Sequence, residues 1–200
     1  MKEFITYNTV RDNGLLLARK MYDENYIPDI IYTSMRGGAY LGNILSEFFK
    51  LAYKNKKRIL YSTVVAHSYS NIHENTEVTL DGWTFPPEKL PPDASVLIVD
   101  DIFDSGATIN YLVNDLIKRG LYKENIKVAV HDYKYFHSSK EQYEIQPDYW
   151  CRKHDIHNKD EDIWIHYMSH ELVGLSETEL EEYYYKRNPS LREVFKGIEL

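Results

Sequence analysis

The chain has 200 residues, 43% of them hydrophobic and 28% charged, which is enough for one well-buried domain. Its net charge of −7 argues against a broad nucleic-acid surface, which needs a basic face to neutralise phosphates. The single cysteine, Cys151, excludes an intramolecular disulfide and fits a reducing compartment. Because no apolar run approaches about 18 residues and no signal peptide is evident, we expect a cytoplasmic protein without a membrane partner.

The first elements in the chain alternate between helix and strand. Apolar residues at helical spacing predict a helix over about 9–24, with Thr9 and Asp12 as its capping box. A buried strand is expected over 29–34, and a second helix follows the glycine turn that ends it. Residues 59–67, rich in β-branched side chains, predict the next strand.

The segment 68–93 lacks clear periodicity and contains Asn, Gly, Pro and charged residues. Long segments of this kind in a compact domain are usually functional loops or disordered. We expect a mobile loop here, with a short hairpin inside it as the alternative.

The second half repeats the order of strand, turn and helix. An apolar strand starts at Val96, a helix after Gly106 ends at Gly120, and another strand covers 126–130. Strands that are apolar throughout are typical of a parallel sheet covered by helices on both faces, so the predicted class is α/β. Beyond Lys134 the pattern is irregular, until Ser176 and Glu179 form a capping box before a helix over 180–186.

Most of the chemical information lies in the segment 96–108. Its apolar strand leads to Asp100 and Asp101, and a turn of small residues then opens a helix. Ligands of open α/β sheets bind at the carboxyl ends of strands, and a helix N-terminus after glycine offers backbone N–H groups to a phosphate. Two carboxylates repel phosphate but suit vicinal hydroxyls or a metal, so a sugar phosphate satisfies both halves. The alternative is that Asp104 and Ser105 only cap the helix beside solvated acids.

This segment resembles the phosphoribosyl pyrophosphate signature of the type I phosphoribosyltransferases. The resemblance implies a Rossmann-like core with a small hood, and a magnesium ion that helps the acids hold the ribose. Asp104 would also be the general base that handles the purine proton. Carried over position by position, the ribose ligands are Asp100 and Asp101, and the phosphate ligands are Asp104, Ser105, Gly106, Ala107 and Thr108.

A second resemblance lies upstream, at Ser34-Met35-Arg36-Gly37-Gly38 with Gly42 beyond. It is similar to the pyrophosphate loop of the xanthine–guanine and hypoxanthine–guanine members of the family. Arg36 and Gly37 would contact pyrophosphate oxygens there, because arginine forms bidentate contacts and glycine lets backbone N–H groups approach.

The base-binding side rests on three residues. A lysine after the corresponding strand donates to the 6-oxo group in purine members, and Lys134 matches it, although lysines after strands are usually just solvated. Trp164 and Ile165 match the stacking aromatic and the residue whose backbone binds the base. A Trp followed by Ile fits a core strand equally well.

An acid seven residues after the stacking aromatic contacts metal or the purine edge in some members. Glu171 has that spacing, so we expect Asp100, Asp101 and Glu171 to be the metal ligands, with His170 as the candidate in a shorter register. The resemblance covers about 28–172 of a single domain spanning 1–200: a core over about 28–135, a hood over about 136–172 and a helical tail over 173–200.

The function implied is transfer of ribose 5-phosphate from phosphoribosyl pyrophosphate to a 6-oxopurine, with Mg²⁺ as cofactor, in a dimer or tetramer. Pyrimidine or orotate transfer is one alternative, although orotate enzymes carry lysines in their mobile loop and 68–85 has no Lys or Arg. A ligand-sensing regulator is another, but DNA-binding relatives add a basic domain that is not visible here. A phosphorolytic enzyme would lack the acid–acid–phosphate loop.

Overall fold

The computed structural model describes residues 2–54, 56–70, 76–137 and 144–198. Its main element is a six-stranded sheet in the order β4-β3-β2-β5-β6-β7, in which β4 alone is antiparallel to its neighbour. The strands are β2 (Ile30–Met35), β3 (Leu60–Ser70), β4 (Thr76–Trp83), β5 (Val96–Phe103), β6 (Ile126–Phe136) and β7 (Tyr149–Ile156). The predicted α/β class, a mostly parallel sheet flanked by helices, is confirmed.

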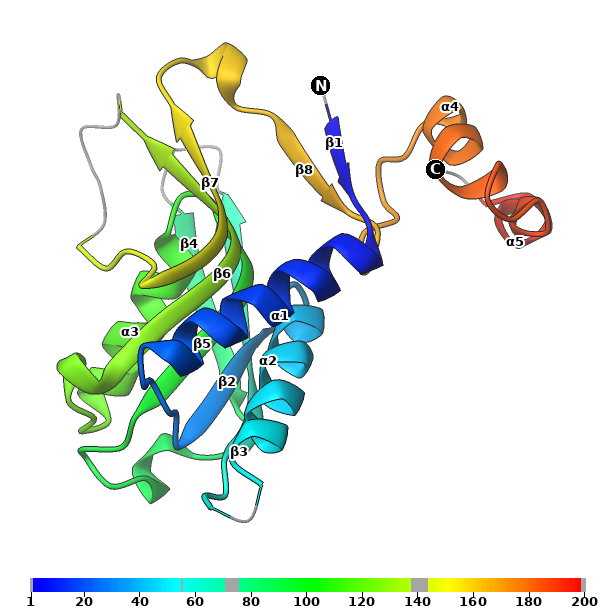
Figure 1. The fold of residues 1–200 in the computed structure, drawn as a ribbon. Coiled ribbons are helices and arrows are strands. Elements are labelled where there is room, and N and C mark those ends of the chain that lie inside the picture. Colours follow the sequence, from blue (N-terminus) through cyan, green and yellow to red (C-terminus); the bar gives the residue numbers. More distant parts are fainter. Residues whose placement is uncertain (1, 55, 71–75, 138–143, 199–200) are drawn as a thin grey trace.

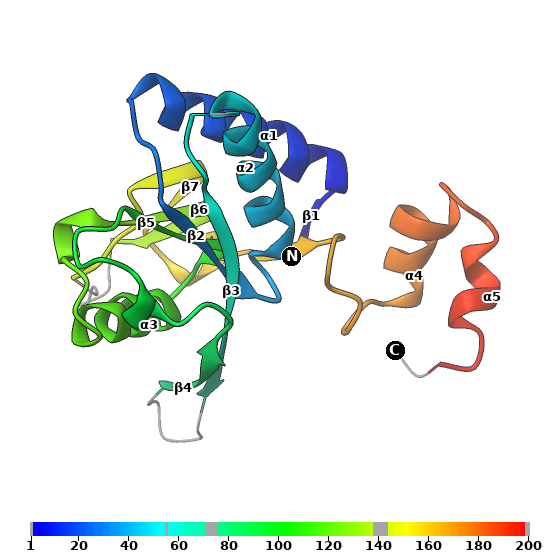
Figure 2. The same cartoon turned by 90° about the horizontal axis from the view of Figure 1, so that it is seen from below.

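Helices cover both faces of this sheet. In Figure 2, α1 (Tyr7–Asp23) and α2 (Ala39–Ala52) lie on one side and α3 (Ala107–Lys118) on the other. Neighbouring residues of a strand pack into hydrophobic cores on opposite faces of the sheet. Ile31 packs beneath α1 and α2, and Ile30 packs against α3. Side chains alternate across a strand, so a strand buried on both faces must be apolar throughout.

A separate two-stranded sheet, called the hood from here on, includes only the last part of the predicted hood segment 136–172. β1 (Lys2–Ile5) pairs in parallel with β8 (Trp164–Tyr167), and Figure 1 shows the pair standing apart from the large sheet. The hood therefore joins the first residues of the chain to a segment more than one hundred and fifty residues later. The sequence pattern did not predict a strand at the N-terminus.

Two predicted boundaries, the cap of α1 and the end of β6, were wrong. The cap of α1 is Thr6, whose hydroxyl accepts from Thr9 N at 3.2 Å, rather than the pair Thr9 and Asp12. β5 continues through both acids to Phe103, and β6 continues to Phe136, so Lys134 lies inside a strand rather than after one. β5 and β6 pair with each other as far as Phe103 and Tyr133, and β6 continues past Lys134 because it pairs with β7 as far as Phe136.

The prediction of a long loop over 68–93 was also wrong for the first part of that segment. β3 runs to Ser70, and β4 returns antiparallel beside it, with a register shift at Val65 and Ala66. The hairpin held as the alternative is therefore the correct one and is longer than expected; residues 71–75 lie outside the described part of the chain. Pairing with β3 gives this polar segment the hydrogen bonds that stabilise it, which its own weak periodicity does not indicate.

The C-terminal tail begins as predicted and then departs from a regular helix. The Ser176–Glu179 capping box is present and opens α4 (Glu177–Leu180). A wider π-helical turn (Glu181–Tyr185) and α5 (Leu191–Phe195) follow. Single 3₁₀ turns elsewhere cover Pro87–Lys89, Lys123–Asn125 and Lys159–Glu161.

The tail packs on the hood and projects from the body in both views (Figures 1 and 2). Its small apolar cluster contains Leu175, Leu180, Tyr184 and Tyr185, packed against Phe4 and Met168 among others. Across the described residues, none of the helices is long and apolar enough to cross a membrane.

Candidate active site

The acid pair lies where β5 ends. Asp100 is buried, with 9% of its surface exposed, and its Oδ1 accepts from Asp101 N at 3.0 Å. Burial, followed by the negative charge of Asp101, raises the pKa of Asp100 well above its ordinary value. A cation or a set of hydroxyl donors would relieve both effects, because either stabilises the ionised carboxylate.

The loop after the acids forms a cavity of about 230 Å³ lined by residues 100–109. Gly106 adopts a φ of +88° at the N-cap of α3, and a Cβ there would lie 2.4 Å from the Phe103 ring. Ser105 Oγ accepts from Ala107 N at 3.3 Å. The first turn of α3 therefore points its backbone N–H groups at the cavity, the usual arrangement of an anion site.

The glycine loop packs directly on the acids. A Cβ on Gly37 would lie 2.3 Å from Asp101 Oδ1, and one on Gly38 would lie 2.5 Å from the Val99 carbonyl. The peptide bond between Met35 and Arg36 in this turn is cis. The two motifs that the sequence separates by about sixty residues are thus brought into contact, and each glycine is required by the closeness of that contact.

Lys134 joins the two sides of the site. Its side chain is buried, and its ammonium lies 2.6 Å from Asp162 Oδ1 and 3.4 Å from Asp104 Oδ1. Asp104 does not cap α3 but faces this lysine. The alternative of a solvated lysine does not hold, because a buried ammonium between two carboxylates is fixed in place.

Trp164 and Ile165 differ sharply in exposure. Trp164 is 61% exposed, so it is not the core residue of the alternative interpretation, whereas Ile165 is 4% exposed and packs in the core below α1. Tyr167 N donates to Glu171, while Met168 N donates to the Ile5 carbonyl on β1. Because backbone groups alternate between the two edges of a strand, those of Ile165 face the edge that β1 does not occupy.

Glu171 and His170, the two candidates for the later acid position, have different contacts in the structure. Glu171 lies against β8, accepting from Tyr167 N at 3.2 Å and lying 3.2 Å from His166 Nδ1. His170 instead reaches the acid pair, with its Nε2 3.0 Å from Asp101 Oδ2. The geometry thus brings His170 rather than Glu171 to Asp101, and the metal role of Glu171 stays a prediction.

The oxygen donors of Asp100 and Asp101 suit Mg²⁺, which usually takes one or two carboxylates together with substrate oxygens and water. Among the described residues, no cluster of three or more His, Cys, Asp or Glu side chains could hold a metal ion without a substrate. Asp100 and Asp101 therefore offer carboxylate oxygens of the kind that a magnesium ion would use.

Sequence reasoning missed two residues that bind the hood to this site. Tyr167 OH lies 2.5 Å from Asp132 Oδ2 and 3.0 Å from the Asp101 carbonyl. Asp132 is fully buried inside β6. The available signal was the pair His131-Asp132 in an otherwise apolar strand, since buried acids are rare unless they are paired.

An open α/β sheet with an acid pair, a glycine-bearing loop and a helix N-terminus at the carboxyl end of one strand defines a protein that binds a phosphorylated sugar or nucleotide. The model of the phosphoribosyl transferase domain matches residues 10–168, and the chain belongs to that family.

Solved structures share this fold at low sequence identity. The purine phosphoribosyltransferase from Pyrococcus horikoshii Ot3 is 22% identical, with a TM-score of 0.64 over 88% of this chain and 98% of that one. A hypothetical protein from Neisseria gonorrhoeae with bound ppGpp is 21% identical, with a TM-score of 0.63 over 86% and 91%. The Helicobacter pylori xanthine-guanine-hypoxanthine phosphoribosyltransferase is 18% identical, with a TM-score of 0.59 over 95% and 99%. No curated protein matches the chain.

Proposed function

We propose that this chain transfers ribose 5-phosphate from phosphoribosyl pyrophosphate to a 6-oxopurine and releases pyrophosphate. The observation that carries the proposal is the contact between the two loops, in which Gly37 packs on the carboxylate of Asp101. That contact supports a pyrophosphate site beside the ribose acids and the phosphate loop. A single ligand that carries a 5-phosphate, a ribose and a pyrophosphate would fit the three sites together.

Each part of the site has one task in this reaction. The N-terminus of α3 binds the 5-phosphate, and Asp100 and Asp101 bind the ribose hydroxyls. Arg36 and the backbone after it bind the departing pyrophosphate, whose charge grows as the bond to C1 breaks. Asp100 and Asp101 would also hold a magnesium ion, which when bound supplies positive charge to the pyrophosphate oxygens.

The purine attacks C1 through a ring nitrogen, and a proton leaves N7. Asp104 is suited to take that proton, because its carboxylate is exposed and lies beside the phosphate loop. The ammonium of Lys134 lies 3.4 Å from Asp104 Oδ1, next to the place proposed for the base. This ammonium can donate to an oxygen at position 6 of the base.

Three features support a 6-oxopurine over a pyrimidine. Trp164 offers an exposed indole for stacking, the free backbone edge at Ile165 can bind a heterocycle, and Lys134 is a buried donor for an oxo group. Two of the structural neighbours described above act on purines by name. The oligomeric state and the cytoplasmic location stay predictions.

The test is a steady-state assay with phosphoribosyl pyrophosphate and Mg²⁺ across guanine, hypoxanthine, xanthine, adenine and orotate. We expect nucleotide formation with at least one 6-oxopurine and none with orotate. Turnover of orotate alone would overturn the purine assignment. Tight binding of phosphoribosyl pyrophosphate without turnover of any base would identify a ligand-sensing regulator instead.

A further inference from the structure

Asp132 is a buried carboxylate with no part in the reaction described above. None of its surface is exposed, although it lies on β6 close to the site. It accepts hydrogen bonds at 2.5–2.7 Å from Tyr167 Oη, His131 Nδ1, His154 Nε2 and Arg152 Nε. Burial opposes its ionisation, but the hydrogen bonds from His131 and His154 outweigh burial and hold the pKa of Asp132 well below its usual range.

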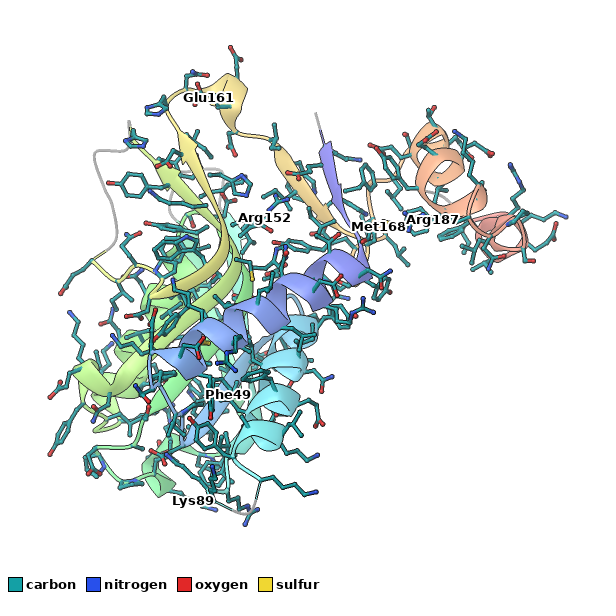
Figure 3. The ribbon with its side chains drawn as sticks, in the orientation of Figure 1. Phe49, Lys89, Arg152, Glu161, Met168 and Arg187 are labelled. Carbon is teal, nitrogen blue, oxygen red and sulfur yellow. The ribbon has the colours of Figure 1, made fainter. Side chains whose placement is uncertain are left out.

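The partners of Asp132 come from both sheets. Figure 3 shows Arg152 reaching from β7 toward the hood, where its guanidinium donates to both carboxylate oxygens of Glu3 on β1, at 2.6 and 2.9 Å. Tyr167 comes from β8, the other strand of the hood. Asp132 and Arg152 thus fasten the small sheet to the end of the large one through charge-assisted hydrogen bonds.

The cluster around Asp132 contacts the site through the side chain of Tyr167. Its hydroxyl, 2.5 Å from Asp132 Oδ2, is also 3.0 Å from the Asp101 carbonyl. Tyr167 lies two residues after Ile165 on the same buried face of β8. One side chain therefore connects the strand proposed to bind the base with the residue proposed to bind the ribose.

We infer that Asp132 is a positioning residue: by fixing the Tyr167 hydroxyl it sets the distance between the base edge of β8 and the ribose acids of β5. The inference rests on the proposed function, in which a base held by the hood must meet C1 of a sugar held by the large sheet. Reaction rates depend steeply on such alignment, and a displacement of about 1 Å costs on the order of 10²-fold.

The competing interpretation is that the cluster only stabilises the fold. Buried ionic groups are weak evidence for stability, because well-packed apolar residues are often as good. The contact with the Asp101 carbonyl distinguishes the two interpretations, since a purely structural cluster has no need to touch the residue that binds ribose.

The experiment compares Tyr167→Phe and Asp132→Asn with a matched control, Tyr32→Phe. Tyr32 is also fully buried, and its hydroxyl donates to the Phe85 carbonyl at 2.8 Å, within the core facing α3. Each of the three variants loses buried polar contacts, but only the first two lie on the path to Asp101. Tyr167→Phe is the milder change and keeps the test valid if Asp132→Asn fails to fold.

For Tyr167→Phe we expect kcat/KM for the base to fall about 10- to 100-fold, with the Kd of phosphoribosyl pyrophosphate changed less than about threefold. Tyr32→Phe should lower Tm and leave both constants near those of the wild type. If Tyr167→Phe lowers Tm while kcat/KM for the base stays unchanged, Asp132 is structural and the inference is wrong. A wild-type enzyme inactive on every base would instead refute the proposed function.

A second readout does not depend on activity. Acrylamide quenching of Trp164 is measured in a Trp83→Phe, Trp150→Phe background, which leaves Trp164 as the sole tryptophan. Because Trp164 and Tyr167 share β8, we expect Tyr167→Phe to change the quenching constant and Tyr32→Phe to leave it unchanged. Identical quenching in the two variants would show that the hydroxyl of Tyr167 does not set the position of β8.

Discussion

The proposed sugar-phosphate half and the proposed base half of the site are built in opposite ways. The first comes from nine consecutive residues, 100–108, on one strand, one turn and one helix N-terminus, with the glycine loop packed against them. The second gathers Glu3, Asp132, Arg152 and Tyr167 from four strands of two sheets. Local geometry sets the first half, whereas long-range packing sets the second, so substitutions in the two halves should fail differently.

The halves meet at two places. Lys134 lies between Asp104 of the phosphate loop and Asp162 before β8. His170 and Tyr167 both contact Asp101, through its side chain and its carbonyl respectively. Changes in the first half should alter the chemical step and sugar-phosphate binding, and changes in the second should alter base binding and stability.

Asp104→Asn should give the largest effect. The amide keeps the shape of the side chain but cannot accept the N7 proton, so we expect kcat to fall by about 10²- to 10⁴-fold. The Kd of phosphoribosyl pyrophosphate, measured by calorimetry, should stay near the wild-type value, and so should Tm, because the carboxylate is 58% exposed. Unchanged kcat would remove Asp104 from the base role.

Asp132→Asn should produce the largest loss of stability. Breaking a buried ion pair on one side costs about 3–5 kcal/mol, here because Arg152, which keeps Glu3, loses its contact with the buried carboxylate. The pKa of Asp132 in the folded state lies below its value of about 4 in the unfolded state. The ionised carboxylate therefore stabilises the fold fully above pH ~4. That contribution is lost as the pH falls toward and through the folded-state pKa.

Urea denaturation at pH 7, 4 and 3 measures this dependence. The free-energy gap between wild type and Asp132→Asn should be full at pH 7 and should narrow below about pH 4. A gap that widens on acidification contradicts the assignment of Asp132 as an ionised buried carboxylate. Glu88→Gln, which breaks an exposed ion pair with Arg119 in the turn before β5, gives the pH dependence of a surface pair for comparison.

Asp101→Ala, alone and with Asp100→Ala, should weaken phosphoribosyl pyrophosphate binding. Hydrogen bonds to charged groups are worth about 1.5–3 kcal/mol, which corresponds to a Kd increase of about 10- to 150-fold. Asp93→Ala, an exposed acid before the opposite end of β5, removes the same charge far from the cavity and should leave Kd unchanged. Wild-type affinity in the double variant would refute the ribose assignment.

The sequence predicted the local geometry at the end of β5 well because its determinants are close together in the chain. The acid pair, Gly106 and the start of α3 are neighbours in the chain, and their order alone indicates an anion site. Glu3 and Arg152 could not be paired in this way, because one hundred and forty-nine residues separate them and neither lies in a motif. The hairpin of β3 and β4 was predicted only as the alternative for a related reason: the stability of β4 comes from its partner strand.

Trp164 gives the smallest expected effect and the clearest separation of the two halves. If its indole stacks on the base, Trp164→Ala should raise the base KM by the equivalent of about 1–3 kcal/mol, or about 5- to 150-fold, and Trp164→Phe should keep most activity. Because Trp164 is 61% exposed, its removal should change stability by no more than about 0.5 kcal/mol. Binding of a purine nucleoside monophosphate should also change Trp164 fluorescence in the Trp83→Phe, Trp150→Phe background. The Kd of phosphoribosyl pyrophosphate serves as the internal control, since the sugar-phosphate half does not include β8. A large drop in Tm with an unchanged base KM would show that Trp164 supports the hood and that the base binds elsewhere.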